Sequence, residues 1–287
     1  MHTLIEPGFR PQHLLQSLLL LASMAALLGL MGWLFAGPEG MVWALMVGLL
    51  AGVLSPGLSP GLLLRHFQAR ELPAWQLPQL QRLVLELSRR AGLEQAPRLY
   101  WLPDSQLNAF TVGSGEHAAL ALSDGLLRAL TPRELSGVLA HEIAHIRHHD
   151  LWLLNLANTV GRLTALLGQF GQMLVLLLLP LSLAGGVQIS WLALLLLIIA
   201  PWGSLLLQLA LSRSREYDAD QGAVDLTGDP VGLAMALEKL ERFQRFNWLN
   251  PWHWGYSPAP GGNLLRTHPI TPKRIQRLLK RHHIAIF

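Results

Sequence analysis

The chain has 287 residues, of which 51% are hydrophobic and 14% are charged, and it contains no cysteine. The absence of cysteine excludes disulfides and thiolate metal ligands, so a metal site must be built from His, Asp and Glu. The formal net charge is +4, but the Arg and Lys residues are dispersed or lie beside apolar stretches, where anionic lipid headgroups are a simpler partner than nucleic acid.

Two apolar stretches near the N-terminus are long enough to cross a bilayer. Residues 14–36 carry no charge, and we interpret them as an uncleaved span, because a cleavable signal peptide has a shorter apolar region followed by a small-residue cleavage site. A turn at residues 37–40 leads into a second apolar stretch at 41–64. The Ser-Pro-Gly sequences at 55–57 and 59–61 indicate that this second helix ends or kinks before it leaves the membrane.

The composition then changes, and residues 65–150 have the character of a water-soluble segment. Apolar residues at helical spacing predict an amphipathic helix over residues 80–91. Ser123 and Asp124 begin a second, short helix. Between these two helices the sequence predicts three short strands, over residues 98–102, 108–113 and 117–122.

A third helix of this segment carries the sequence HEIAH at residues 141–145. Thr131, Pro132 and Glu134 have the pattern of a capping box with proline at the first helical position, and an apolar stripe runs from there into the motif. Helix positions four apart lie on one face, so the two imidazoles are expected to project side by side. The motif therefore lies well inside a predicted helix.

The chemistry of this motif is that of a metal site. Two neutral imidazoles, from His141 and His145, suit Zn²⁺, and Glu142 could take a proton from a metal-bound water. The helical context disfavours the alternative that both His side chains are satisfied by hydrogen bonds alone. In zinc peptidases an edge strand beside the metal commonly binds the substrate backbone, and residues 108–113 (NAFTVG) are the candidate; an ordinary strand of a small sheet is the alternative.

Two further apolar stretches follow the predicted metal helix, which we expect to continue without a break into residues 151–182. That stretch is too long for one crossing at 1.5 Å per residue, so its first turns are expected outside the membrane. A Gly-Gly turn then leads to a fourth span at 188–212, which Pro201 is expected to interrupt.

The charges that flank the apolar stretches predict their orientation. The loops at 37–40 and 183–189 contain neither Lys nor Arg. Arginines lie at the opposite ends of the spans, at Arg10, Arg65, Arg70, Arg147, Arg213 and Arg215. Both termini, the water-soluble segment and the metal helix are therefore expected on the cytoplasmic side.

A catalytic zinc site takes three protein ligands and keeps one position for water. Because two antiparallel spans return the chain to the side it left, residues near 213 are expected to emerge close to residues near 150. Glu216 is the glutamate that the returning span places there, and Asp220 shares its helical face and could hydrogen-bond the far nitrogen of a ligand His. The alternative is that these carboxylates and the nearby arginines form a charged belt at the membrane edge.

The C-terminal part contains two more predicted helices. Residues 228–230 (Gly-Asp-Pro) end the preceding helix, and apolar residues over 233–243 predict an amphipathic one. Residues 247–263 are rich in Trp, Pro and Gly, and the sequence leaves open whether they form a lid or rest on lipid headgroups. A basic helix is predicted from Thr271.

Taken together, the NAF sequence, HEIAH followed by two apolar spans, SREYDAD at 214–220 and a late Thr-His-Pro resemble the HtpX family of membrane zinc metallopeptidases. That family is related to the type-I CAAX prenyl endopeptidases. The resemblance covers nearly the whole chain. It implies a bacterial inner-membrane protease with a cytosolic gluzincin-like site, acting in the quality control of membrane proteins.

The resemblance also implies a role for each matching residue. His141, His145 and Glu216 match the ligands of one Zn²⁺ ion, Glu142 matches the catalytic acid/base, and Asp220 matches the carboxylate behind the ligands. His268 is expected to donate to the tetrahedral oxyanion. The remaining matches are expected to contact substrate and are Asn108, Ala109, Phe110 and Arg274.

The predicted architecture is mainly α-helical with a small β-sheet, and it combines four transmembrane helices with a cytosolic gluzincin-like zinc metalloprotease domain. The boundaries are 1–64 for the first two spans, 213–287 for the second part of the catalytic domain, and 65–150 and 151–212 for the segments between them. A CAAX prenyl-protein endopeptidase and a non-catalytic metal-binding membrane scaffold remain alternatives. Membrane proteins are the expected substrates, and the sequence leaves the oligomeric state open.

Overall fold

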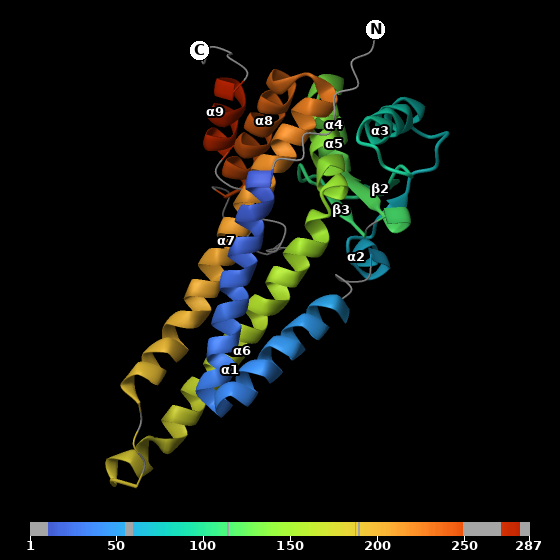
Figure 1. Cartoon of the computed structure of the whole chain (residues 1–287). Coiled ribbons are helices and arrows are strands. Elements are labelled where there is room, and N and C mark those ends of the chain that lie inside the picture. Colours follow the sequence, from blue (N-terminus) through green and yellow to red (C-terminus); the bar gives the residue numbers. More distant parts are fainter. Residues whose placement is uncertain are drawn as a thin grey trace. The chain divides into compact units, whose positions relative to one another are not determined.

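The computed structural model of the chain describes residues 11–54, 60–113, 115–186, 188, 190–248 and 271–281. These residues are mainly helical and include one small mixed sheet (Figure 1). The chain divides into two compact units. We call the first the helical unit, Met1–Ser55 with Leu154–Ser214, and the second the sheet unit, Pro56–Leu153 with Arg215–Phe287.

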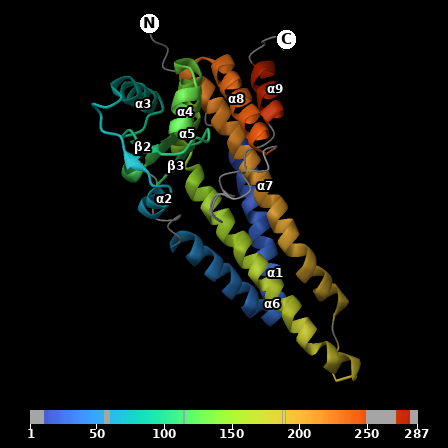
Figure 2. The ribbon, with the colours of Figure 1, turned by 180° about the vertical axis from the view of Figure 1, so that it is seen from behind.

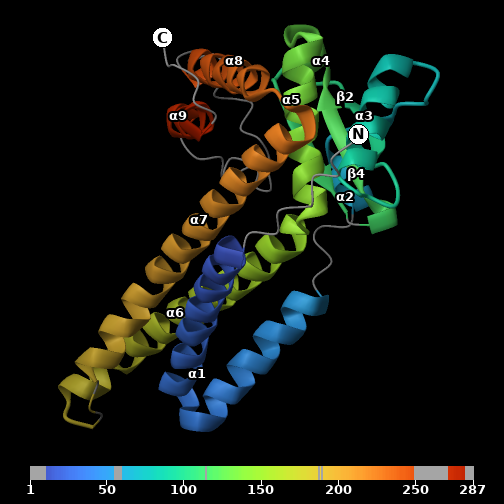
Figure 3. The same ribbon diagram turned by 45° about the horizontal axis from the view of Figure 1, so that its top comes forward.

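In the helical unit, α1 (Pro11–Leu54) consists of two helical segments joined at a break. Ala36 and Gly37 leave the helical conformation, and Gly37 has a φ of +60°, which glycine adopts without steric cost. The two segments then run back along each other, and they approach so closely that a Cβ added at Gly32 would collide with the main-chain oxygen of Gly40 (Figure 3). The predicted turn between the first two apolar stretches therefore lies at this break.

Three described helices are long and apolar enough to cross a membrane: α1, α6 (Asp150–Leu183) and α7 (Trp191–Thr227). The predicted interruption at Pro201 is wrong, because α7 continues through it to Thr227. The proline ring packs closely on α6, where a Cβ added at Gly168 would lie 2.6 Å from Pro201 Cγ. Apolar helices tolerate an internal proline where a neighbouring helix accommodates it.

The predicted continuity between the metal helix and the third apolar stretch is also wrong. Helix α5 (Pro132–Arg147) ends at a C-cap, His148, and α6 begins at Asp150. Between them His149 has a φ of +55°, a left-handed value that is uncommon for a residue with a side chain. This tight turn separates the two helices and leaves Asp150 beside His145, with 2.8 Å between Oδ2 and Nδ1.

The sheet of the sheet unit has the strand order β1-β2-β4-β3. Strands β2 and β4 are parallel, and the other two neighbouring pairs are antiparallel. The bounds are Arg70–Glu71 for β1, Arg98–Leu102 for β2, Ala109–Val112 for β3 and Ala119–Ser123 for β4. All three predicted strands are confirmed. Strand β3 lies at an edge of the sheet: it pairs with β4 on one side, and no described strand pairs with its other side.

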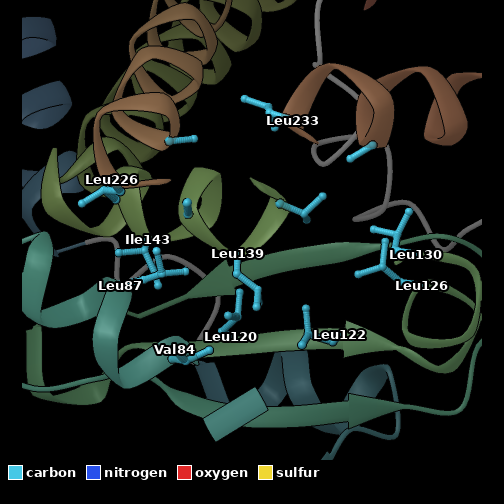
Figure 4. Close-up of a cluster of buried hydrophobic side chains, with 14 of the residues drawn as sticks. Val84, Leu87, Leu120, Leu122, Leu126, Leu130, Leu139, Ile143, Leu226 and Leu233 are labelled. Carbon is cyan, nitrogen blue, oxygen red and sulfur yellow. The ribbon is translucent and has the colours of Figure 1, made fainter. Parts of the chain in front are cut away.

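The two faces of the sheet contact different helices. One face packs against α3 (Pro78–Arg90) and α5 in a large apolar cluster, part of which is drawn in Figure 4. The opposite face packs against α2 (Pro60–His66). Figure 2 shows α2 and α3 on opposite sides of the strands. Strands β3 and β4 are thus largely buried and apolar, whereas β1 is charged and exposed.

Local sequence signals account for the other helices of the sheet unit. The predicted capping box of α5 is confirmed, with Thr131 and Glu134 bonded to each other's main chains at 3.3 and 2.8 Å. Ser123 caps α4 (Asp124–Ala129). Helices α8 (Pro230–Trp248) and α9 (Thr271–Arg281) follow, and α8 approaches α5 closely, because a Cβ added at Gly137 would lie 2.9 Å from Leu233 Cα.

Candidate metal centre

Three buried side chains of the sheet unit converge on one point: His141 and His145 from α5, and Glu216 from α7. Their ligand atoms all lie within 4.8 Å of one another. The two Nε2 atoms are 3.2 Å apart, and the Glu216 carboxylate oxygens lie 3.4 Å from His141 Nε2 and 3.7 Å from His145 Nε2. One helical turn brings the two imidazoles together, and the end of α7 adds the carboxylate.

These separations fit a small tetrahedral cation. Two ligands bound at about 2.05 Å with a tetrahedral angle between them are about 3.3 Å apart, and the measured separations run from 3.2 to 3.7 Å. Two imidazole nitrogens and a carboxylate form a donor set known in catalytic metal sites, and a fourth position is left for water. The three residues could therefore hold a metal ion.

Asp220 lies one turn beyond Glu216 on α7 and contacts the far nitrogen of His141. The distance from His141 Nδ1 to Asp220 Oδ1 is 3.1 Å, and Asp220 is 2% exposed. An Nδ1–H donated to this carboxylate leaves Nε2 unprotonated and directed at the metal position. The spacing of four residues between Glu216 and Asp220 predicts this arrangement.

Asp150, whose role could not be predicted from the sequence, makes the equivalent contact with the second imidazole. Its Oδ2 lies 2.8 Å from His145 Nδ1, and the residue is fully buried. Arg215 approaches the other carboxylate oxygen, with Nε 3.4 Å from Oδ1. The sequence contains one signal for this role: Asp150 is an acidic residue at the start of an apolar stretch, and a charge in that position needs a partner.

These contacts determine the electrostatics of the paired imidazoles. Burial lowers the pKa of His141, but the hydrogen bonds with Asp220 and Glu216 outweigh burial and raise it to about 9. Burial and the contact with Asp150 oppose each other in the same way at His145, and its pKa is also raised. The carboxylates thus favour positive charge at the imidazoles, and a bound cation would supply it in place of the protons on the two Nε2 atoms.

Glu142 follows the first ligand on α5 and is 7% exposed. Thr111, on the edge strand β3, donates a hydrogen bond from Oγ1 to Glu142 Oε2 at 2.9 Å. Nothing in the sequence singles out Thr111, because a threonine in a short strand is ordinary. A buried carboxylate beside a metal position is suited to accept a proton from water.

The three residues Asn108, Ala109 and Phe110 lie at the start of β3. Asn108 is half-buried, and its main chain pairs with Ser123: the N–H donates to Ser123 Oγ at 2.9 Å, and the carbonyl accepts from Ser123 N at 3.0 Å. The ring of Phe110 is 3% exposed and lies on the α2 face of the sheet, 5.3 Å from the ring of Phe67. Contrary to the expectation that it contacts substrate, the Phe110 side chain belongs to the core, and its main chain faces the neighbouring strand β4, as that of Asn108 does.

Arg274 on α9 reaches the same centre and is 3% exposed. Its Nε and Nη2 donate to the two Asp220 oxygens at 2.8 and 2.6 Å, and Nη1 lies 3.4 Å from Glu216 Oε2. Burial opposes the charge of this guanidinium, but the carboxylates outweigh burial and raise its pKa. Arg274 therefore holds two carboxylates of the centre. His268, the expected oxyanion donor, lies outside the residues that the structure describes.

The assembled centre has the parts needed for metal-assisted hydrolysis. Three donors surround a position for a cation, carboxylates orient both imidazoles, and a separate glutamate lies next in sequence to the first ligand. A cation in such a site polarises a carbonyl and activates water, and the glutamate moves the proton.

The model of peptidase family M48 matches residues 74–282. A protease HtpX homolog from Ralstonia nicotianae is 34% identical over 291 residues, which cover 92% of this chain and 95% of the relative. A protease HtpX homolog from Burkholderia thailandensis is also 34% identical, covering 91% of this chain and 94% of that protein. The crystal structure of S. mikatae Ste24p matches with a TM-score of 0.49 and 19% identity, over 92% of this chain and 64% of that one.

Proposed function

Since the chain belongs to peptidase family M48 and is a membrane metallopeptidase, we propose that it uses one zinc ion to hydrolyse peptide bonds of membrane proteins. The observation that carries this proposal is the buried group of His141, His145 and Glu216, whose separations suit a tetrahedral ion. Two nitrogens and one oxygen, in a chain without cysteine, favour zinc over softer metals. Bound there, zinc would act as a Lewis acid on water and on the scissile carbonyl.

In the proposed mechanism Glu142 moves the proton. Its carboxylate takes a proton from the attacking water and later delivers it to the leaving amine. Asp220 and Asp150 hold the imidazoles in the tautomer that directs Nε2 at the ion, as their distances of 3.1 and 2.8 Å to the Nδ1 atoms suggest.

We further propose that His268 donates a hydrogen bond to the tetrahedral oxyanion. Arg274 supports the centre by holding Asp220 and Glu216. A His268→Ala variant is therefore expected to keep its metal and to lose turnover. Full turnover in that variant would remove the assignment and leave the metal chemistry intact.

The edge strand β3 is the proposed binding site for the substrate backbone, together with the side chain of Asn108. The main chain of Asn108 faces β4, because its carbonyl accepts from Ser123 N. Successive residues of an antiparallel strand direct their main-chain groups to opposite sides. The N–H and C=O of Ala109 and Thr111 therefore point away from β4, to the side where an extended peptide could add as a further strand.

The proposed topology has four spans, with both termini and the catalytic centre on the cytoplasmic side of a bacterial inner membrane. A straight helix as long as α1, which has 44 residues, would extend about 66 Å, more than twice the roughly 30 Å hydrocarbon core. The break at Ala36 and Gly37 supports counting its two segments as separate spans. Arginine at the opposite ends of all four spans supports the orientation. Damaged or misfolded membrane proteins are the proposed substrates.

Two variants of the purified protein test the catalytic proposal. Glu142→Gln is expected to keep one zinc per chain and to lose casein hydrolysis by about 10²–10⁴-fold, the usual contribution of a general acid–base. Glu216→Ala is expected to lose both the zinc and the activity. Glu238→Gln, an exposed glutamate paired with Arg242 on α8, is the matched control and should behave as wild type.

The outcomes separate the proposal from its rivals. A metal-binding scaffold would show no zinc-dependent hydrolysis in the wild type, and its role would survive Glu142→Gln. A prenyl-protein endopeptidase would cleave a farnesylated peptide in preference to an unmodified membrane protein. Wild-type zinc content in Glu216→Ala would contradict the assignment of the third ligand.

A further inference from the structure

Thr111 places a buried hydroxyl on an apolar face of the sheet. The residue is 5% exposed. Its partner across the strand pair is Leu120, and on the same face Leu120 and Ala109 pack into the large apolar cluster with α5. A buried hydroxyl costs free energy unless it is hydrogen-bonded. Valine has nearly the same shape, so packing alone gives no reason for a hydroxyl at this position.

The hydroxyl bonds to the carboxylate that we assign as the general base. Thr111 Oγ1 donates to Glu142 Oε2 at 2.9 Å, with both residues buried. Hydrogen bonds to an ionised acceptor are stronger than neutral ones. The bond restrains rotation of the glutamate side chain, and it uses one carboxylate oxygen while the second can take a proton.

The same residue also has its main chain at the proposed substrate edge. Thr111 and Ala109 alternate with residues whose main chains face β4, so the Thr111 N–H and C=O point to the open side of β3. One residue therefore connects a strand that could pair with the substrate to the side chain that moves the proton.

We propose that Thr111 is a positioning residue, whose hydroxyl orients the Glu142 carboxylate relative to a substrate strand held along β3. This inference rests on the proposed peptidase function. It assigns the edge strand a second task beyond binding, because the strand also fixes the angle at which the base meets the attacking water.

The test compares variants of the full-length, zinc-loaded protein on one peptide substrate. Thr111→Val keeps the shape and removes the donor, and it is expected to lower kcat roughly 10- to 100-fold, as for loss of one hydrogen bond to a charged group. KM should stay within about threefold and zinc should remain at one per chain, because neither the main chain nor the metal ligands change. Thr111→Ser restores the donor and should recover most of kcat.

A matched control is Thr164→Val on α6, in the helical unit. Thr164 is also fully buried, but its hydroxyl bonds to its own helix at Val160 O, 2.9 Å away, so kcat should not change. Thr111→Ala is a second donor-free variant, to be used in case Thr111→Val folds poorly. It should show the same loss of kcat. Melting temperature and zinc content identify misfolded samples.

Wild-type kcat in both donor-free variants would overturn the inference, as would a Thr111→Ser enzyme as slow as Thr111→Val. A rise in KM with kcat unchanged would also overturn it, since Thr111 would then act in binding alone. Failure of the proposed function looks different: the wild type itself would lack zinc-dependent hydrolysis, or Glu142→Gln would retain it.

Discussion

At the scale of single residues, each imidazole of the centre has its own buried carboxylate. His141 is paired with Asp220 and His145 with Asp150. The two carboxylates come from different helices, α7 and α6, so no single helix determines the orientation of both ligands. Such carboxylates fix the tautomer and raise the basicity of a ligand, and their loss typically weakens metal binding more than it disturbs the fold.

We predict that Asp150→Asn lowers zinc affinity about 10- to 100-fold. Asparagine keeps the size of the side chain and one acceptor oxygen, but it removes the charge that holds the proton on His145 Nδ1. Competition with a chromophoric zinc chelator at constant pH measures the change. Asp225→Asn, at an exposed carboxylate that accepts from Gln221 on α7, is the control and should bind zinc as tightly as wild type. An unchanged affinity in Asp150→Asn would contradict the role of this carboxylate.

The residues that could be predicted from the sequence are those related by helical spacing. His141 with His145, and Glu216 with Asp220, are separated by four positions, and that spacing places each pair on one face. Asp150 and Thr111 carry no such signal. Asp150 approaches His145 only because the helix ends between them, and Thr111 approaches Glu142 only because β3 packs against α5. Both contacts depend on tertiary structure.

At the scale of elements, the sequence predicts the helix caps but not the break after α5 or the continuity of α7. The capping box of α5 and the Ser123 cap of α4 involve neighbouring residues, so the sequence contains everything that forms them. The break after Arg147 was not predictable, because the sequence has an uninterrupted helical pattern there. In the structure the helix ends nonetheless, and the turn at His149 lets the buried Asp150 contact His145. Pro201 stays within α7 because a glycine of α6 accommodates its ring.

The start of α8 gives a prediction about stability and pH. Asp229 is its N-cap and accepts from Gly232 N at 2.9 Å and from Arg133 Nη2 of α5 at 2.7 Å. The hydrogen bond from Arg133 is the main reason why the pKa of Asp229 is lowered. The stabilisation is therefore fully present above the unfolded-state pKa of about 3.9, and it is lost as the pH falls through the lower folded-state value.

Two substitutions separate the cap from the charge. Asp229→Asn keeps an acceptor for the cap. It should abolish only the fall in melting temperature that protonation of Asp229 causes at acid pH. Asp229→Ala removes the cap as well and should cost about 1 kcal/mol more at neutral pH. Thermal unfolding of the detergent-solubilised protein between pH 2 and pH 7 measures both. The account fails if Asp229→Asn shows the same acid dependence as wild type.

At the scale of the whole molecule, the proposed topology depends on how α1 is counted. Its apolar length is that of two spans, and its break at Ala36 and Gly37 lies near the middle. The turn could be predicted from the sequence, because Gly-Pro-Glu-Gly separates two apolar stretches. The side of the membrane on which the catalytic centre lies rests on the arginine distribution.

Single engineered cysteines test this topology, and the absence of native cysteine makes the labelling unambiguous. A cysteine at Glu39, in the bend of α1, or at Ala184, beyond α6, should react with a membrane-impermeant maleimide in spheroplasts. A cysteine at the exposed Glu94 should react only after lysis. Protection at Glu39 would contradict the four-span topology, and labelling at Glu94 in intact spheroplasts would contradict the cytoplasmic placement.

The position of Glu216 late in α7 has a consequence for biosynthesis. While the ribosome is still translating the apolar part of that helix, the nascent polypeptide carries both histidines but not the third ligand. Arg274, which holds that ligand's carboxylate, is translated later still. If Glu216 is the third ligand, as proposed, a growing chain has no complete metal centre until α7 has been translated, and proteolytic competence would arise only after that point.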